Sequence, residues 1–290
     1  MQFHQAQRKK AKLRLALTGP SGAGKTYGAL VVAKGLGGKI AVIDTERGSA
    51  SLYSDIVDFD VLELDPPYTP ERFLEAMKAA EAAGYSTVIL DSITHEWSGV
   101  GGCLEMNDAL AKAKFKGNTW SAWNETTPRH RAFIDAILRS PMHVIATMRS
   151  KTETTQVEEN GKKKVAKLGM KSEQRDGLEY EFTVVLDISH DGNIALASKD
   201  RTRLFADPVR LSAETGQLLL EWLESGKDPA QMMAEEVDMA IEAMRGCDNL
   251  GSLQGIFAGA WKRCDEVNKA RLKAEYDQLK SALETKEQAA

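Results

Sequence analysis

Short apolar runs alternate with amphipathic helical patterns along the first two hundred residues of the chain. The apolar runs are short and rich in β-branched residues, whereas the segments between them repeat apolar residues every three or four positions. This alternation is typical of an α/β domain with a mainly parallel sheet between helices. The predicted strands are 13–18, 39–44, 61–64, 87–91 and 143–147, and the predicted helices are 25–35, 70–83, 103–114 and 128–138.

The pattern changes towards the end of the chain. Two strands, 180–188 and 193–198, flank His190-Asp191-Gly192 and predict an antiparallel hairpin. A helix at 211–223 then precedes a Gly- and Pro-containing linker at 225–229. Beyond it the composition is helical and predicts a small helical bundle. We therefore expect two domains, 1–225 and 229–290.

Composition narrows the class of protein further. Of the 290 residues, 42% are hydrophobic, which suits a chain that buries a core. The three cysteines are scattered without a CxxC pair, as expected for a protein of the reducing cytoplasm rather than a disulfide framework or zinc site. No stretch resembles a signal peptide or a membrane span. The net charge of −4 gives no global case for nucleic-acid binding, so such a case depends on local patches.

The segment Gly19–Thr26, GPSGAGKT, matches the P-loop pattern G-x-x-x-x-G-K-[ST] between a predicted strand and a predicted helix. Glycines allow such a loop to curl so that its backbone N–H groups face phosphate oxygens. Lys25 would then supply positive charge to the β- and γ-phosphates, and the Thr26 hydroxyl would bind Mg²⁺. The predicted nucleotide contacts are Gly19, Pro20, Ser21, Gly22, Ala23, Gly24, Lys25, Thr26 and Tyr27.

Three carboxylates are candidates for the chemistry beside the P-loop. Asp91 ends an apolar strand and suits a second magnesium ligand. Hydrolysis also needs a group that positions the attacking water. Glu46 follows the strand 39–44, at the sheet edge where ligands bind in open α/β folds, and we favour it. Glu96, five residues after Asp91, is the alternative.

These elements, in this order, resemble the RecA-like branch of P-loop ATPases. The resemblance implies a catalytic glutamate in the Asp-x-Glu context that contains Glu46, and an aromatic residue, here Tyr53, stacked on adenine. Thr147, or nearby Arg149, would occupy the place of the γ-phosphate sensor, where that branch usually carries Gln or Asn. Lys199 and Arg201 match two basic residues that reach the ATP of a neighbouring subunit. The implied fold is a RecA-like P-loop core with an antiparallel hairpin at one edge and a small C-terminal helical domain.

A closer resemblance is to phage-encoded ATPases of the Sak-four type, which assist single-strand annealing and recombination. It is carried by GPSGAGKTYGAL, VIDTERGSASLY, ILDSITHEW, WSAWNETTPRHRAFIDAILRSPMHVIATMRSK and LGMKSEQRDGLEYEFTVVLDI, which together span most of residues 12–205. The resemblance implies ATP hydrolysis with Mg²⁺, binding of single-stranded DNA and self-association in the bacterial cytoplasm. The C-terminal helices could contact a single-stranded-DNA-binding protein or act as a stabilising cap.

The polar stretch 149–177 is the expected counterpart of a DNA-binding loop in this comparison. Within it, Asn160-Gly161 is a good hairpin-turn dipeptide. Its basic residues outnumber its acids and could follow a phosphate backbone, although such loops are usually solvated surface. Trp97, Trp120 and Trp123 also suit base stacking, but we expect them to pack in the interior because tryptophans are usually mostly buried. The predicted DNA contacts are Arg149, Lys151, Lys162, Lys163, Lys164, Lys167, Lys171 and Arg175.

Two other functions remain open from the residues alone. GPSGAGKT also opens many small-molecule kinases, but the long polar stretch has few of the arginines that a kinase lid uses. A motor or loader ATPase that acts on a protein or on duplex DNA would share the fold. An ABC-type cassette is disfavoured because no LSGGQ-like signature occurs.

Overall fold

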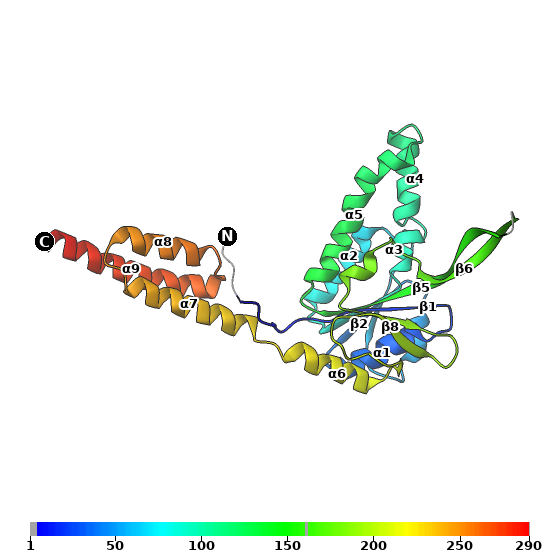
Figure 1. Cartoon of the computed structure of the whole chain (residues 1–290), viewed down its shortest axis with the longest axis horizontal. Helices are drawn as coiled ribbons and strands as arrows, with labels where there is room; N and C mark the ends of the chain where they lie inside the picture. Colours follow the sequence, from blue (N-terminus) through cyan, green and yellow to red (C-terminus); the bar gives the residue numbers. More distant parts are fainter. Residues whose placement is uncertain (1–4, 160–161, 290) are drawn as a thin grey trace. The chain divides into compact units, whose positions relative to one another are not determined.

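The computed structural model describes residues 5–159 and 162–289, with side chains placed throughout that part except at 152–170 and 286–289 (Figure 1). The chain divides into two compact units. One comprises residues 12–223, and the other comprises residues 224–290 with the N-terminal segment up to Ala11. The sequence-based boundaries instead gave that N-terminal segment to the first domain.

The first unit is a mixed α/β domain. Its strands are β1 (Arg14–Gly19), β2 (Ile40–Asp44), β3 (Asp60–Glu63), β4 (Thr87–Asp91), β5 (His143–Glu159), β6 (Lys162–Ser172), β7 (Val184–Ile188), β8 (Ile194–Asp200) and β9 (Val209–Arg210). Its helices are α1 (Lys25–Leu36), α2 (Pro70–Ala82), α3 (Thr94–Ser98), α4 (Cys103–Lys114), α5 (Thr119–Arg139) and α6 (Ala213–Glu224), with 3₁₀ turns η1 (Ser49–Tyr53) and η2 (Leu178–Glu181).

The sheet is mainly parallel, in the order β3-β2-β4-β5-β1-β7-β8-β9. The six strands from β3 to β7 run parallel, whereas β8 and β9 add in antiparallel fashion at one edge. This confirms the predicted parallel sheet with an antiparallel hairpin at its edge. Strand β5 lies between β1 and β4, so the strand before the P-loop and the strand that ends in Asp91 each border it.

Both faces of the sheet are covered by helices, because successive side chains of a strand point to opposite faces. On β1, Leu15 and Leu17 join a core with α1 and α6, whereas Ala16 joins a second core with α2 and α5. In the second core the rings of Phe73 and Phe133 pack with their centroids 5.2 Å apart. Strands buried on both faces explain the near-continuous apolar runs in the sequence.

Helix α5 is longer than predicted, because it begins at Thr119 and contains Pro128 rather than starting there. The Asn118 side chain caps it by accepting a hydrogen bond from the amide of Ser121 (3.1 Å). Pro128 removes one amide donor from the helix, but it lies on the exposed side, where water can satisfy the carbonyl of Asn124. Helices α4 and α5 run side by side as a helical hairpin (Figure 1).

Residues 149–159 and 162–172 form a two-stranded ribbon rather than the predicted loop. Strand β5 continues past the end of the sheet and pairs with β6, from Ser150 opposite Ser172 to Glu159 opposite Lys162. The ribbon projects from the domain (Figure 1). The β-branched residues of 152–157 favour this extended structure. The predicted turn at Asn160-Gly161 lies outside the described residues.

The second unit contains three helices, α7 (Pro229–Arg245), α8 (Leu250–Trp261) and α9 (Glu266–Ala289). Val237, Ile241 and Met244 of α7 pack with Leu253 of α8 and Leu272 of α9, in line with the predicted helical bundle. None of the helices within the described part of the chain has the length and apolar character of a membrane span.

Candidate nucleotide-binding site

The P-loop joins β1 to α1 at the carboxyl edge of the sheet. Gly22 and Gly24 have φ angles of 78° and 85°, which a residue with a side chain adopts only under strain. Helix α1 begins at Lys25, and its N-cap Gly24 offers no side-chain acceptor to the first amide groups. Those N–H donors, together with the positive end of the helix dipole, suit an anionic ligand such as a phosphate.

The Lys25 side chain folds back onto the backbone of the P-loop. Its ammonium donates to the carbonyl oxygens of Gly19 (2.9 Å) and Pro20 (2.8 Å). Burial lowers the pKa of Lys25, and the nearby carboxylates of Asp91 and Glu46 act in the opposite direction. The structure therefore gathers the predicted phosphate ligand Lys25, the predicted magnesium ligand Asp91 and the predicted catalytic residue Glu46 around one point.

Asp91 ends β4, where the register of the sheet pairs Leu90 with Ala146 of β5. Its carboxylate is buried and accepts two hydroxyl donors. Thr26 at the start of α1 donates to Oδ2 (2.7 Å), and Thr147 of β5 donates to Oδ1. Burial raises the pKa of Asp91, and these two hydrogen bonds oppose that effect. Three segments distant in sequence thus converge on one carboxylate.

The donor set around Asp91 fits magnesium. Mg²⁺ prefers oxygen ligands and binds through one or two protein oxygens together with phosphates and waters. Thr26 and Asp91 supply a hydroxyl and a carboxylate within hydrogen-bonding distance of each other, directly beside the phosphate loop.

Glu46 lies in the loop after β2 and is held by Arg149 of β5. The guanidinium contacts both carboxylate oxygens, with Nη2 at 2.8 Å from Oε1 and 2.6 Å from Oε2. Asp44 fixes the same loop by accepting the amides of Glu46 (2.5 Å) and Ala50 (3.0 Å). Such a two-point contact orients the carboxylate as well as pairing its charge. Arg149, predicted both as a DNA contact and as an alternative to Thr147 for the γ-phosphate sensor, is therefore a neighbour of the nucleotide site.

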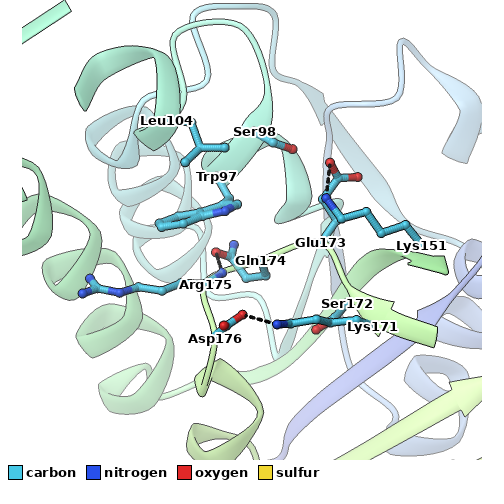
Figure 2. A pocket seen from close by; sticks show the side chains of 10 residues that line it. All are labelled: Trp97, Ser98, Leu104, Lys151, Lys171, Ser172, Glu173, Gln174, Arg175 and Asp176. Atoms are coloured by element: carbon cyan, nitrogen blue, oxygen red, sulfur yellow. Dashed lines mark hydrogen bonds and ion pairs between the residues drawn. The ribbon is translucent and has the colours of Figure 1, made fainter. Parts of the chain in front are cut away.

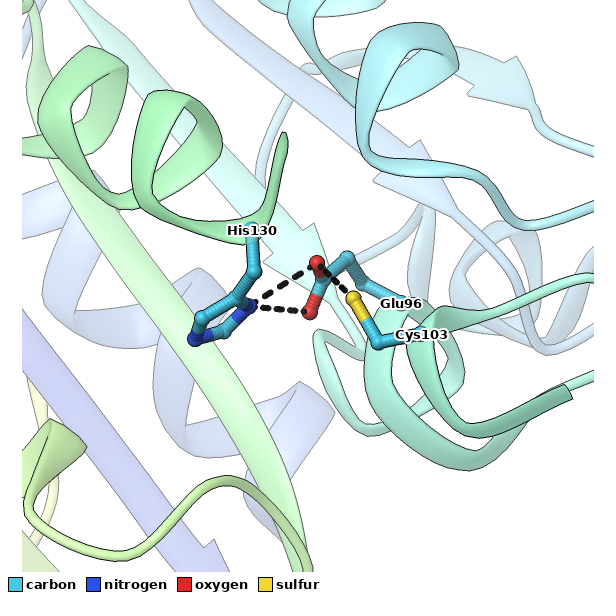
Figure 3. Close-up of side chains that lie close together, drawn as sticks. All are labelled: Glu96, Cys103 and His130. Atoms are coloured by element: carbon cyan, nitrogen blue, oxygen red, sulfur yellow. Dashed lines mark hydrogen bonds and ion pairs between the residues drawn. The ribbon is translucent and has the colours of Figure 1, made fainter. Parts of the chain in front are cut away.

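Glu96 occupies a different environment, in a buried cluster with Cys103 and His130 (Figure 3). It is fully buried, and its carboxylate contacts His130 Nδ1 (3.0 Å) and accepts from Cys103 Sγ (3.0 Å) and Gln174 Nε2 (3.4 Å). Burial and the adjacent Glu96 raise the pKa of the Cys103 thiol. A protonated thiol is a poor metal ligand, and the three groups already satisfy one another. We interpret the cluster as structural.

An aromatic pocket adjoins the P-loop. It has a volume of about 380 Å³ and includes Tyr27 and Tyr53, whose rings meet edge to face with centroids 6.4 Å apart. Asn193 and Arg210 also line it, and Asn193 donates to the carbonyl of Ala23 in the P-loop (2.8 Å). The pocket is large enough for a planar base beside the phosphates. Sequence reasoning missed Asn193 and Arg210, because the β7–β8 turn and β9 reach the P-loop only in the folded chain.

Lys199 and Arg201 lie together at the antiparallel edge of the sheet. Both donate to the backbone carbonyl of Tyr180, Arg201 at 3.2 Å. Burial, followed by the positive charge of Arg201, lowers the pKa of Lys199. The two cations are therefore adjacent, while their action on a neighbouring subunit remains a prediction.

The remaining predicted DNA contacts lie on or beside the ribbon. Lys151 is 3.9 Å from Glu173, and Lys171 is 2.8 Å from Asp176. The Arg175 guanidinium lies over the ring of Trp123, 5.9 Å from its centroid. The side chains of Lys162, Lys163, Lys164 and Lys167 lie outside the described residues.

The fold and this site define a P-loop nucleoside-triphosphatase. An AAA domain model matches residues 11–213, more than half of the chain, and the protein belongs to that family. A crystal structure of the RadB recombinase is similar, with a TM-score of 0.39 and 16% identity over 72% of this chain and 90% of that one. That likeness is too distant to carry a functional argument. No curated protein matched the chain.

Proposed function

We propose that this protein is an ATP-hydrolysing DNA recombination or single-strand annealing factor of the phage type, which binds single-stranded DNA as an oligomer. The observation that carries the proposal is the course of β5. The strand contacts Asp91 through Thr147 and Glu46 through Arg149, and then continues as one strand of the projecting ribbon. A single continuous strand therefore links the nucleotide site to the basic surface.

In the proposed reaction, Lys25 and the P-loop amides bind the phosphates of ATP and orient the γ-phosphate. Mg²⁺, held by Thr26 and Asp91, would neutralise phosphate charge. Glu46 positions the attacking water. Its carboxylate has enough lone pairs to accept both from Arg149 and from that water. We favour Glu46 over Glu96 for this role because Glu96 faces the interior and is fully buried.

Thr147 suits the role of a γ-phosphate sensor because it bonds to Asp91 and belongs to β5. A change in phosphate occupancy would alter this hydroxyl contact and the Arg149 contact two residues further along the same strand. In the reverse direction, DNA held on the ribbon would bias the Glu46–Arg149 pair. This reciprocity is the thermodynamic requirement of coupling between two sites.

The ribbon has the charge that a phosphate backbone requires. Residues 149–175 contain eight basic residues and four acidic ones, although the whole chain is acidic. Binding through such residues releases counterions and therefore weakens with salt. The Lys199/Arg201 pair would act on the ATP of the neighbouring subunit, stabilising charge on the transferring phosphoryl group. The C-terminal helices would offer a surface to a single-stranded-DNA-binding protein.

Direct binding and phosphoryl transfer separate this proposal from the alternatives. Fluorescence anisotropy with a labelled single strand should show binding that strengthens with ATP and weakens with salt, and weaker binding to duplex DNA. Preference for duplex would favour a motor or loader instead. The absence of DNA binding, together with transfer of the γ-phosphate to a nucleoside or another metabolite, would identify a small-molecule kinase and contradict the proposal.

A further inference from the structure

Three tryptophans line a pocket beside the base of the ribbon. Trp120 and Trp123 lie three residues apart on α5, and together with Trp97 of α3 they line a volume of about 500 Å³. Side chains three residues apart share one face of a helix. Trp120 is 86% exposed, which corrects the expectation that all three tryptophans pack in the interior. An indole left this open is unusual for a residue that is mostly buried in proteins.

The inner wall of the pocket is held by ring packing and hydrogen bonds. The rings of Trp97 and Trp123 stack with centroids 5.5 Å apart and an angle of 20° between their planes. The ring of Trp97 also packs against that of His130, with centroids 5.3 Å apart, and His130 is hydrogen-bonded to the buried Glu96. Arg175 lies over the ring of Trp123. The buried cluster of Glu96, Cys103 and His130, which plays no part in our proposed chemistry, therefore supports the ring of Trp97 from the interior.

A second, larger hollow of about 780 Å³ adjoins the first and shares Trp97 and Arg175 with it (Figure 2). It adds Lys151 and Lys171 from the base of the ribbon. Their acidic partners, Glu173 and Asp176, form exposed pairs, which contribute little and can be exchanged for phosphate contacts. A continuous surface thus runs from the tryptophans beside α5, past Arg175, to Lys151 and Lys171 at the base of the ribbon.

We propose that a nucleobase of a bound single strand stacks in this tryptophan pocket, next to Trp120, while the adjoining cations contact its phosphates. The inference rests on the proposed function and adds to it a site at which a base of the DNA is bound. Stacking on aromatic side chains accepts any base, because every base has a π-face. A duplex cannot use the pocket, since its bases are already stacked and paired. The pocket therefore gives preference for single strands without preference for sequence.

The test compares Trp120→Ala and Trp120→Phe with the unchanged chain, on oligothymidylate and on the same strand with abasic residues. Trp120 is exposed, so its replacement should leave folding and DNA-independent ATP turnover intact. Trp120→Ala should lose about 5- to 150-fold in affinity for the base-bearing strand, and Trp120→Phe should retain most of it. On the abasic strand the three proteins should differ little. The salt dependence should be the same for all, because stacking releases no counterions.

Equal affinity of Trp120→Ala and the unchanged chain for oligothymidylate would overturn base stacking in the pocket while leaving the proposed function in place. An equal loss on both strands would also overturn it, because the effect would then not depend on bases. Altered self-association with unchanged DNA affinity would assign the pocket to a protein contact instead. Failure of the unchanged chain to bind either strand would contradict the proposed function itself.

Discussion

At the scale of single residues, Asp91 shows how the site departs from what stability alone would favour. Asp91 is 2% exposed, and burial raises the pKa of its carboxyl group. A buried anion is costly unless a cation or several donors compensate for it. Thr26 and Thr147 supply two hydroxyl donors, but the described residues around Asp91 place no arginine or lysine in direct contact with it. The residue is therefore suited to a bound cation.

Asp91→Asn should raise the melting temperature of the nucleotide-free protein at neutral pH and abolish ATP turnover. The folded pKa of Asp91 lies above its ordinary value of 3.8, so the folded chain binds more protons than the unfolded chain between the two values. Stability consequently falls as the pH rises through that window. The gain from Asp91→Asn should be largest near neutral pH and shrink as the pH falls towards 3.8. Thermal melts across that range measure it.

Asp44→Asn is the matched control for this comparison. Asp44 is also buried, but its two oxygens accept the amides of Glu46 and Ala50, and an asparagine can satisfy only one of them. This variant should melt at a lower temperature than the unchanged chain. A lower melting temperature for Asp91→Asn at neutral pH as well would contradict the claim that the buried Asp91 carboxylate destabilises the nucleotide-free protein.

The Glu46–Arg149 pair gives a second prediction. Glu46→Gln should lower turnover by about 10²- to 10⁴-fold while ATP binding changes little, because a water-positioning group acts in the transition state. Arg149→Ala should cost less turnover and reduce the response of turnover to DNA, since it removes the link from β5 to Glu46. Steady-state kinetics with and without a single strand test both. An Arg149→Ala variant that keeps the full response to DNA would show that the pair does not couple the sites.

Sequence reasoning reached the residues whose signal is local. Lys25 and Thr26 stand in a contiguous motif, and Asp91 ends a conspicuous apolar strand. The partners of Glu46 and Glu96 could not be predicted from the sequence, because Arg149 is 103 residues from Glu46 and His130 is 34 residues from Glu96. Such pairs depend on strand order and helix packing, which no local pattern encodes.

At the scale of elements, the ribbon of β5 and β6 is the part most open to test. Replacing Lys162, Lys163 and Lys164 by alanine should weaken binding of a single strand and make it less sensitive to salt. Each lost phosphate contact lowers the slope of log affinity against log salt by about 0.7, so three contacts would lower it by about 2. Turnover without DNA should not change.

Replacement of Lys269, Lys273 and Lys280 on α9 is the charge-matched control. It removes the same charge from the second unit and should leave DNA affinity and its salt dependence within a small factor of the unchanged chain. If both triple variants weakened binding equally, net charge rather than the ribbon would explain the effect.

Elements were predicted well where one pattern dominated and poorly where two competed. The sheet and α4 followed directly from apolar spacing. Helix α5 was predicted to start at Pro128, because proline favours the first turn, whereas Asn118 caps the helix ten residues earlier. The ribbon carried β-branched residues and a good turn dipeptide, but its charge suggested a loop. Trp120 was wrongly expected in the interior, since the sequence does not reveal that its side of α5 lacks a covering element.

At the scale of the whole molecule, the proposal requires an assembly in which Arg201 serves a neighbouring subunit. Lys25→Ala and Arg201→Ala should each lose turnover alone but recover part of it when mixed. A mixed interface can combine an intact P-loop with an intact Arg201, and random assembly produces this at about one quarter of the interfaces. Lys25→Ala mixed with Glu46→Gln is the control, because both residues serve the same subunit in our scheme. Recovery in the control, or none in the test mixture, would contradict action between subunits.

The division into two units also belongs to this scale. The nucleotide site and the ribbon lie wholly in residues 12–223, and the AAA domain match covers nearly the same region. The bundle of α7, α8 and α9 has its own core and contributes none of the site residues described above. Its proposed role as a surface for a single-stranded-DNA-binding protein is therefore separable from nucleotide chemistry.

The central claim is that β5 joins ATP hydrolysis to single-stranded DNA. The most direct measurement is the ATP turnover rate of the full chain with and without a single strand, at low and moderate salt, beside Lys25→Ala. We predict turnover that rises with the single strand, a rise that weakens with salt, and no turnover in Lys25→Ala. Turnover that is indifferent to DNA at both salt concentrations, or that persists in Lys25→Ala, would contradict the account.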